Sequence, residues 1–163
     1  MMEEQMGIAI QDTYDERYSW CYGCGRLNEQ GLQIKTRWDG DKTVTSYLPR
    51  NEHMAIPGFV YGGLIASIID CHGTASAAMA LHRKNGFEPG EGPEPPRFVT
   101  ASLHIDYLKP TPQNVPLTVI GTIEEIHPKK WRVTVGLYAE DTCCAKGEVI
   151  AAVMPKTFMK SDD

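Results

Sequence analysis

The sequence predicts an α+β fold in which a curved antiparallel sheet of about six strands wraps around one long central helix. Residues 62–83 form a nearly uncharged segment whose apolar side chains recur at three- and four-residue steps, which is typical of a buried helix. The flanking segments instead alternate apolar and polar residues, as half-buried strands do. Two such segments precede the helix and four follow it, and the short turns between them favour antiparallel pairing.

Size and composition indicate a single soluble domain spanning 1–163. Its 42% hydrophobic and 23% charged residues are ordinary for a globular protein. A net charge of -5 argues against nucleic acid as a partner. The longest apolar run, 62–81, is interrupted by Asp70, so we expect a core helix and no membrane partner. The acidic start lacks the basic and apolar regions of a signal peptide, so we expect a cytoplasmic protein.

The segments before the helix predict an N-terminal arm and a hairpin. Residues 1–20 are expected to form an arm or a short helix. Alternation from 32 to 38 predicts a strand, and Asp39-Gly40-Asp41 predicts the hairpin turn because Asp-Gly accepts positive φ angles. The chain then returns as a strand over 42–48, and a loop over 50–60 leads to the helix.

The segments after the helix predict a loop and then strands without another helix. Residues 84–96 are rich in proline, glycine and acid, so they form a surface loop. We expect a loose polar tail at 156–163. Edge strands of such a sheet need a partner, so we predict a homo-oligomer, either a dimer or a dimer of dimers. The four predicted strands are 97–109, 116–127, 131–140 and 143–154.

The five cysteines do not indicate a disulfide framework, because their number is odd and no secretion signal is seen. Cys21 and Cys24 form a CxxC, but a zinc site usually needs two more ligands, and the adjacent Cys143-Cys144 pair does not supply a second CxxC. A redox CxxC normally opens a helix, whereas the glycines around this one favour a loop. We therefore predict a turn with inert thiols and no metal.

Four segments resemble the hotdog fold, specifically the PaaI-like acyl-CoA thioesterases. The similarity covers roughly 20–155, nearly the whole domain. The segment that begins with Cys21 and Cys24 also resembles the subgroup that includes the human thioesterase superfamily member 4. The resemblance implies a hotdog fold that hydrolyses an acyl-CoA thioester to the free acid and coenzyme A. The segments are Cys21-Tyr-Gly-Cys-Gly25 with Asn28, Gly31 and Leu32; Pro57-Gly-Phe-Val-Tyr-Gly-Gly63; Asp70, seven residues beyond the second glycine; and Asp106-Tyr-Leu-Lys-Pro110.

The resemblance also implies a catalytic site. In such enzymes the N-terminus of the helix lies under the thioester carbonyl. Two glycines let the chain approach a ligand closely, and unpaired N–H groups stabilise an oxyanion, so we assign this role to Gly62 and Gly63. The family's helical acid falls on Asp70, which would act as general base or nucleophile. A hydroxyl partner for the acid or its water falls on Thr100.

The distance between these groups implies a shared site. Asp70 lies about 12 Å along the helix from its start, and in the family the acid and the glycine usually belong to different subunits. The family commonly has His-Gly-Gly, whereas here Tyr61 replaces the histidine. We predict that Tyr61, His53 and Phe59 bind substrate. No cofactor is expected beyond the coenzyme A carried by the substrate.

Other functions stay open on the sequence. A non-catalytic acyl-CoA binding or regulatory module is one, and the Tyr61 replacement keeps it open. Hydration of an enoyl-CoA on the same fold is another, but it usually needs an acid and a histidine together, and no Asp-x-x-x-x-His follows in this helix. His72 points away from Asp70 by helical geometry, so we predict a packed core histidine. Asp70 itself could be structural, although buried acids are disfavoured unless paired or useful.

Overall fold

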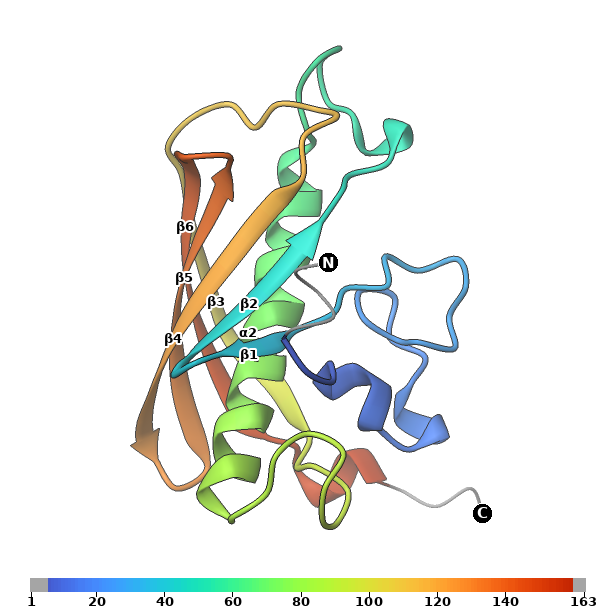
Figure 1. Ribbon diagram of the computed structural model, residues 1–163, viewed down its shortest axis with the longest axis vertical. Helices are drawn as coiled ribbons and strands as arrows, with labels where there is room; N and C mark the ends of the chain where they lie inside the picture. Colours follow the sequence, from blue (N-terminus) through green and yellow to red (C-terminus); the bar gives the residue numbers. More distant parts are fainter. Residues whose placement is uncertain (1–5, 160–163) are drawn as a thin grey trace.

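The computed structural model describes residues 6–159, in which one long helix packs against a curved, open six-stranded sheet (Figure 1). Helix α2 spans Gly62–Lys84. The strand order is β1-β2-β4-β5-β6-β3 and every neighbouring pair is antiparallel. This arrangement is the predicted hotdog fold. The strands are β1 Arg37–Asp39, β2 Lys42–Tyr47, β3 Phe98–Tyr107, β4 Leu117–His127, β5 Lys130–Ala139 and β6 Thr142–Val153.

The helix is held by a single large apolar cluster between its inner face and the sheet. Ile68 and Ile69 are fully buried there. Gly73 lets the helix approach β6 closely, because a Cβ at that position would lie 2.5 Å from Val149. Each fully buried aliphatic side chain contributes roughly 1.5–3 kcal/mol. Within the described residues α2 is also the one helix long and apolar enough to span a membrane, but 61% of its most apolar window is buried in this fold.

A polar network lies inside the same core and fixes the rotation of α2 against β2. His72 is fully buried, as predicted, and its ring nitrogens lie 3.1 Å from Thr43 Oγ1 and 2.7 Å from Thr45 Oγ1. Thr43 Oγ1 also lies 2.6 Å from Ser76 Oγ, one turn further along the helix. Every polar side chain in this network has a partner, which is the condition for burying it without a large cost.

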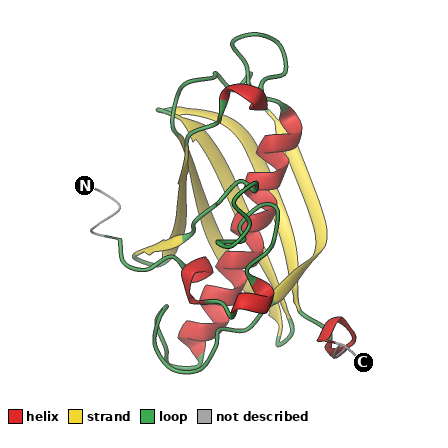
Figure 2. Ribbon diagram, turned by 90° about the vertical axis from the view of Figure 1, so that its right-hand side faces the viewer, coloured by secondary structure: helices red, strands yellow, loops and turns green. Residues whose placement is uncertain are grey.

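The N-terminal segment covers the face of α2 that the sheet leaves open (Figures 1 and 2). It contains two 3-10 helices, η1 (Ile10–Thr13) and η2 (Glu16–Tyr18), which fit the short-helix alternative of the prediction. Ile10 is fully buried in a second apolar cluster with Met79 of α2. This packing holds the segment against the helix. Residues 1–5 of the predicted arm lie outside the described residues.

The predicted strand over 32–38 is shortened to Arg37–Asp39. The alternation of buried side chains is present, with Leu32 and Ile34 inward. Their backbone N–H groups, however, donate to Tyr22 and Gly23 at 2.8 and 3.0 Å, so this stretch pairs with the CxxC loop and not with the sheet. Periodicity identified the buried face but could not identify the pairing partner.

The ends of the other elements follow from local chemistry. Helix α2 stops where Gly86 adopts a φ of +96°, a left-handed conformation that glycine allows. Gly40, in the predicted hairpin turn, has a φ of +64°. The segment from 85 to 97 is a loop before β3. The predicted loose tail begins instead with a 3-10 helix, η4 (Lys156–Met159), and residues 160–163 lie outside the described residues.

The buried His72 predicts a pH-dependent stability. Burial lowers the pKa of His72 to about 3, whereas an unfolded histidine has a pKa of about 6.5. The unfolded chain therefore binds a proton that the folded chain excludes, so stability is lost as the pH falls below about 6.5 and the loss levels off near the folded pKa. Between pH 7 and pH 5 this group should lower the free energy of unfolding by about 2 kcal/mol.

Urea unfolding of wild type and His72→Gln at both pH values measures this effect. We expect the pH-dependent loss to be smaller in His72→Gln by about that amount. His127→Gln is the control, because His127 is exposed next to the β4–β5 turn, and it should behave as wild type. Equal pH dependence in His72→Gln and wild type would contradict the assignment.

Candidate active site

The N-terminus of α2 offers unpaired backbone donors. Tyr61 is the N-cap residue in extended conformation, and Gly62 and Gly63 are the first helical residues. Their N–H groups have no intrahelical acceptor, and none elsewhere in the described residues contacts them. With the positive end of the helix dipole, these donors can stabilise a developing negative charge.

Two tyrosine rings surround this glycine pair. A Cβ at Gly63 would lie 2.3 Å from the Tyr61 ring, so a glycine is needed for that ring to rest where it does. The hydroxyl of Tyr107, at the end of β3, donates to the Gly62 carbonyl at 2.8 Å. A cavity of about 390 Å³ opens beside Gly62 and Tyr107. The helix start is therefore accessible to a ligand as well as rich in donors.

Asp70 and Thr100 are brought together, as the resemblance implies. Asp70 is half-buried in the middle of α2, and the Thr100 hydroxyl donates to its Oδ1. No hydrogen-bond partner for Oδ2 is recorded within residues 6–159. One carboxylate oxygen is thus held in place and the other is available to a reactant.

A bulge in β3 is what turns Thr100 toward the helix. Thr100 pairs with Ala151 and Ser102 pairs with the preceding Ile150, so Ala101 is an extra residue in the ladder. A bulge reverses which face the following side chains occupy. Unbroken alternation along β3 would instead place Thr100 on the face opposite Leu103 and Ile105.

The Asp70–Thr100 pair lines a cavity of about 210 Å³. It lies between α2, the start of β3 and the CxxC loop. The wall is closed on one side by the buried Phe98, whose ring packs edge-on against Trp131 at 5.3 Å between centroids. The other lining residues are Tyr14, Cys21, Cys24, Cys71, Thr74, Ala75, Arg97 and Val99.

The glycine pair and the acid do not meet within one chain. Eight helical residues separate Gly62 from Asp70, about 12 Å of rise, and the two groups line different cavities. A thioester carbonyl bound at one cannot contact the other. Each chain therefore carries two half-sites at different heights on the same helix.

The predicted substrate-binding residues are spread out. His53 is linked to the site only through its carbonyl, which accepts the Tyr61 N–H at 2.8 Å, while its Nδ1 accepts the Arg50 N–H at 3.0 Å. Burial and the Arg50 guanidinium lower the pKa of His53. Phe59 lines a third cavity of about 400 Å³ with Pro112. Tyr61 is thus the one of the three that lies against the glycine pair.

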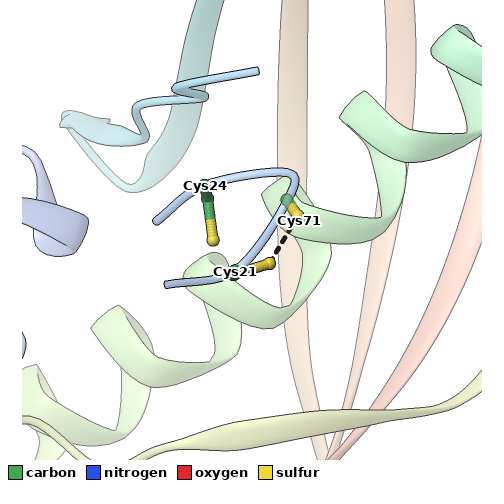
Figure 3. A group of neighbouring side chains, drawn as sticks. All are labelled: Cys21, Cys24 and Cys71. Carbon is green, nitrogen blue, oxygen red and sulfur yellow. Dashed lines mark hydrogen bonds between the residues drawn. The ribbon is translucent and has the colours of Figure 1, made fainter. Parts of the chain in front are cut away.

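Three thiols gather in one cluster (Figure 3), and they line the same cavity as Asp70. Cys21 and Cys24 come from the N-terminal loop and Cys71 from α2, and all three sulfur atoms lie within 4.8 Å of one another. Hydrogen bonds from Cys24 and Cys71 lower the pKa of the Cys21 thiol, and the same bonds with Cys21 raise the pKa of both donors. The cluster therefore favours one thiolate.

The sequence alone did not identify two of these residues. Tyr107 stood inside the Asp106–Pro110 segment, but nothing in that segment indicates that its hydroxyl reaches the helix start. Cys71 has no CxxC spacing, so only the fold brings it to Cys21 and Cys24. The signal that could have found it was its place next to Asp70 on the same apolar helix.

Comparisons with known proteins identify the family. The family model of the thioesterase superfamily matches residues 57–145, which include the helix and both half-sites. A thioesterase superfamily protein from Shewanella loihica is similar at 45% identity, with 85% of this chain and 97% of that chain covered and a TM-score of 0.65. No curated protein matches the chain.

More distant structures share the fold alone. A thioesterase from Haemophilus influenzae is 15% identical, with 76% of this chain and 79% of that chain covered and a TM-score of 0.60. The PaaI protein from the phenylacetic acid degradation operon of E. coli is 13% identical, with 76% and 81% covered and a TM-score of 0.60. Fold, matched residues and the Shewanella relative together establish that this chain belongs to the thioesterase superfamily, whose members are thioester hydrolases.

Proposed function

We propose that this protein hydrolyses acyl-CoA thioesters at a site shared by two copies of the chain. The observation that carries the proposal is the Asp70–Thr100 hydrogen bond in a cavity of its own, on the helix whose start presents the Gly62 and Gly63 N–H groups. A positioned acid and a set of oxyanion donors are the two parts that hydrolysis of a thioester needs.

The chemistry follows from these parts. The thioester oxygen accepts hydrogen bonds from Gly62 and Gly63, which stabilise it as it gains charge. In one route Asp70 removes a proton from water as the water oxygen bonds to the acyl carbon, the C–S bond then breaks, and the coenzyme A thiolate leaves with the proton that Asp70 holds. In the other route the Asp70 carboxylate attacks the acyl carbon, the C–S bond breaks to give an anhydride and a thiolate that takes up a proton, and water then hydrolyses the anhydride to free the acid and Asp70. Thr100 keeps the carboxylate oriented throughout.

The exposed edge of the sheet supports the shared site. Strand β3 pairs only with β6, and its other edge is open over ten residues. Large side chains on it are exposed, including Tyr107 at 55% and Leu103 at 39%. Such an edge is normally covered. A second copy joined along β3 would cover it and bring its own helix to Asp70.

The alternatives on this fold have less support. In residues 6–159 no histidine lines the Asp70 cavity, and His72 is turned to β2. The acid–histidine pair that enoyl-CoA hydration uses therefore has no counterpart there. A pure binding module would not need a carboxylate held in place by Thr100. Substrate contacts by Tyr61, His53 and Phe59, and a cytoplasmic location, remain predictions.

Replacing Asp70 tests the catalytic acid. Asp70→Asn keeps the shape and the Thr100 partner but removes the base and nucleophile, so kcat should fall at least about 100-fold. The release of free thiol from short, medium, long and aryl acyl-CoAs measures the rate and identifies the substrate class. Asp141→Asn, in the exposed β5–β6 turn, is the matched control. If acyl-CoA binds but neither wild type nor Asp70→Asn turns over, the protein is a binding module.

Replacing Gly62 with proline tests the oxyanion donor. Gly62 is the first residue of α2, where proline is compatible with a helix, and Tyr61 has the extended conformation that a following proline requires. Gly62→Pro therefore removes one N–H with little effect on the fold. We expect kcat to fall about 100- to 1,000-fold. Gly62→Ala, which keeps the N–H, should retain most of the activity; equal losses in both variants would contradict the role.

Mixing two inactive variants tests the shared site. If the acid and the glycines belong to different subunits, a mixed dimer of Asp70→Asn and Gly62→Pro has one site with neither change. Random exchange of subunits at equal amounts should then restore about a quarter of the wild-type activity. The measurement is thiol release after denaturing and refolding the two variants together. No recovery, with mixed dimers shown by mass spectrometry, would place both groups in one subunit.

A further inference from the structure

The three-thiol cluster beside Asp70 has the dimensions of a metal site. The Sγ atoms of Cys21 and Cys71 are 4.0 Å apart, and those of Cys21, Cys24 and Cys71 all lie within 4.8 Å of one another. Zn²⁺ binds thiolates at about 2.3 Å in a tetrahedral arrangement, which places the sulfur atoms about 3.8 Å apart. A small inward movement of the three side chains reaches that geometry.

The CxxC loop is shaped around the third cysteine. A Cβ at Gly23 would lie 2.3 Å from Cys71 Sγ, so any larger residue there would displace the thiol. The loop is closed by a Gly25 N–H bond to the Cys21 carbonyl at 2.8 Å. A hydrogen bond also links the loop to the segment that follows it, because the Ile34 N–H donates to the Gly23 carbonyl at 3.0 Å. The convergence of the thiols is thus built into a fixed backbone.

We propose that Cys21, Cys24 and Cys71 bind one Zn²⁺ ion, with water from the adjoining Asp70 cavity in the fourth position. Three thiolates form a soft ligand set, which selects zinc or copper(I) over calcium or magnesium. The thiol protons are released to solvent on binding. We predicted no metal from the sequence because the CxxC supplies only two ligands, Cys21 and Cys24. The fold adds Cys71 as the third. This proposal does not depend on the proposed function.

A bound Zn²⁺ ion would cross-link the N-terminal loop to α2 at Cys71, the residue next to Asp70. Two ligands come from a loop with no regular secondary structure, and the third is the neighbour of Asp70 in sequence. Binding would therefore fix the wall of the 210 Å³ cavity that Asp70 and Thr100 line. Metal removal should loosen the loop before it unfolds the sheet.

Cobalt substitution measures the site directly. The reduced full-length protein, stripped of metal with a chelator, is titrated with Co²⁺ without oxygen. We expect thiolate-to-cobalt charge-transfer absorption that saturates at one ion per chain and disappears when Zn²⁺ is added. Cys71→Ser and Cys21→Ser should lose the saturating signal. Cys143→Ser, a half-buried cysteine on β6 outside the cluster, is the matched control and should keep it.

A second measurement does not depend on how the variants fold. Zinc should protect Cys21, Cys24 and Cys71 of the wild type, and not Cys143, from alkylation by iodoacetamide, as read by peptide mass spectrometry. The proposal is overturned if the wild type binds no Zn²⁺ stoichiometrically, or if a folded Cys71→Ser variant binds as well as wild type. It is also overturned if two of the three cysteines form a disulfide in air and the reduced protein binds no metal.

Discussion

The whole structure depends on a helix that is covered from both sides. The sheet packs on one face of α2 and the N-terminal segment on the other, so the middle of the helix is largely shielded from water. Polar side chains buried there need partners inside the protein. Three consecutive residues of α2 show how such side chains are paired by hydrogen bonds. Asp70 pairs with Thr100 of β3, Cys71 with Cys21 of the loop, and His72 with the threonines of β2.

These neighbours point in different directions because successive helical residues are about 100° apart. The same rotation therefore gives three adjacent residues three separate environments. His72 is enclosed by hydroxyls and apolar side chains, and burial keeps it neutral. Asp70 and Cys71 instead border a cavity. The residue that fixes the helix against the sheet and the two residues that line the cavity are thus neighbours in sequence but lie in different environments.

The division of the site into two half-sites follows from the same helix. Its N-terminus presents N–H donors, but its middle is where a buried carboxylate can be held by a neighbouring strand. A single straight helix cannot bring the two within reach of one thioester. An open β3 edge, with Tyr107 anchored to Gly62, lies beside both half-sites. The oligomerisation that we propose along this edge would therefore serve the chemistry as well as stability.

The amino-acid sequence by itself determined the elements and their inner faces. Apolar spacing in 62–83 and alternation in the strands reflect local geometry, so the helix, the hairpin at Gly40 and the succession of elements along the chain could be predicted from them. The family pattern also located Asp70 and Thr100. Only the tertiary structure decided which groups meet. The bulge at Ala101 that turns Thr100 inward, and the approach of Cys71 to the CxxC loop, depend on contacts between segments far apart in the chain, which local periodicity does not encode.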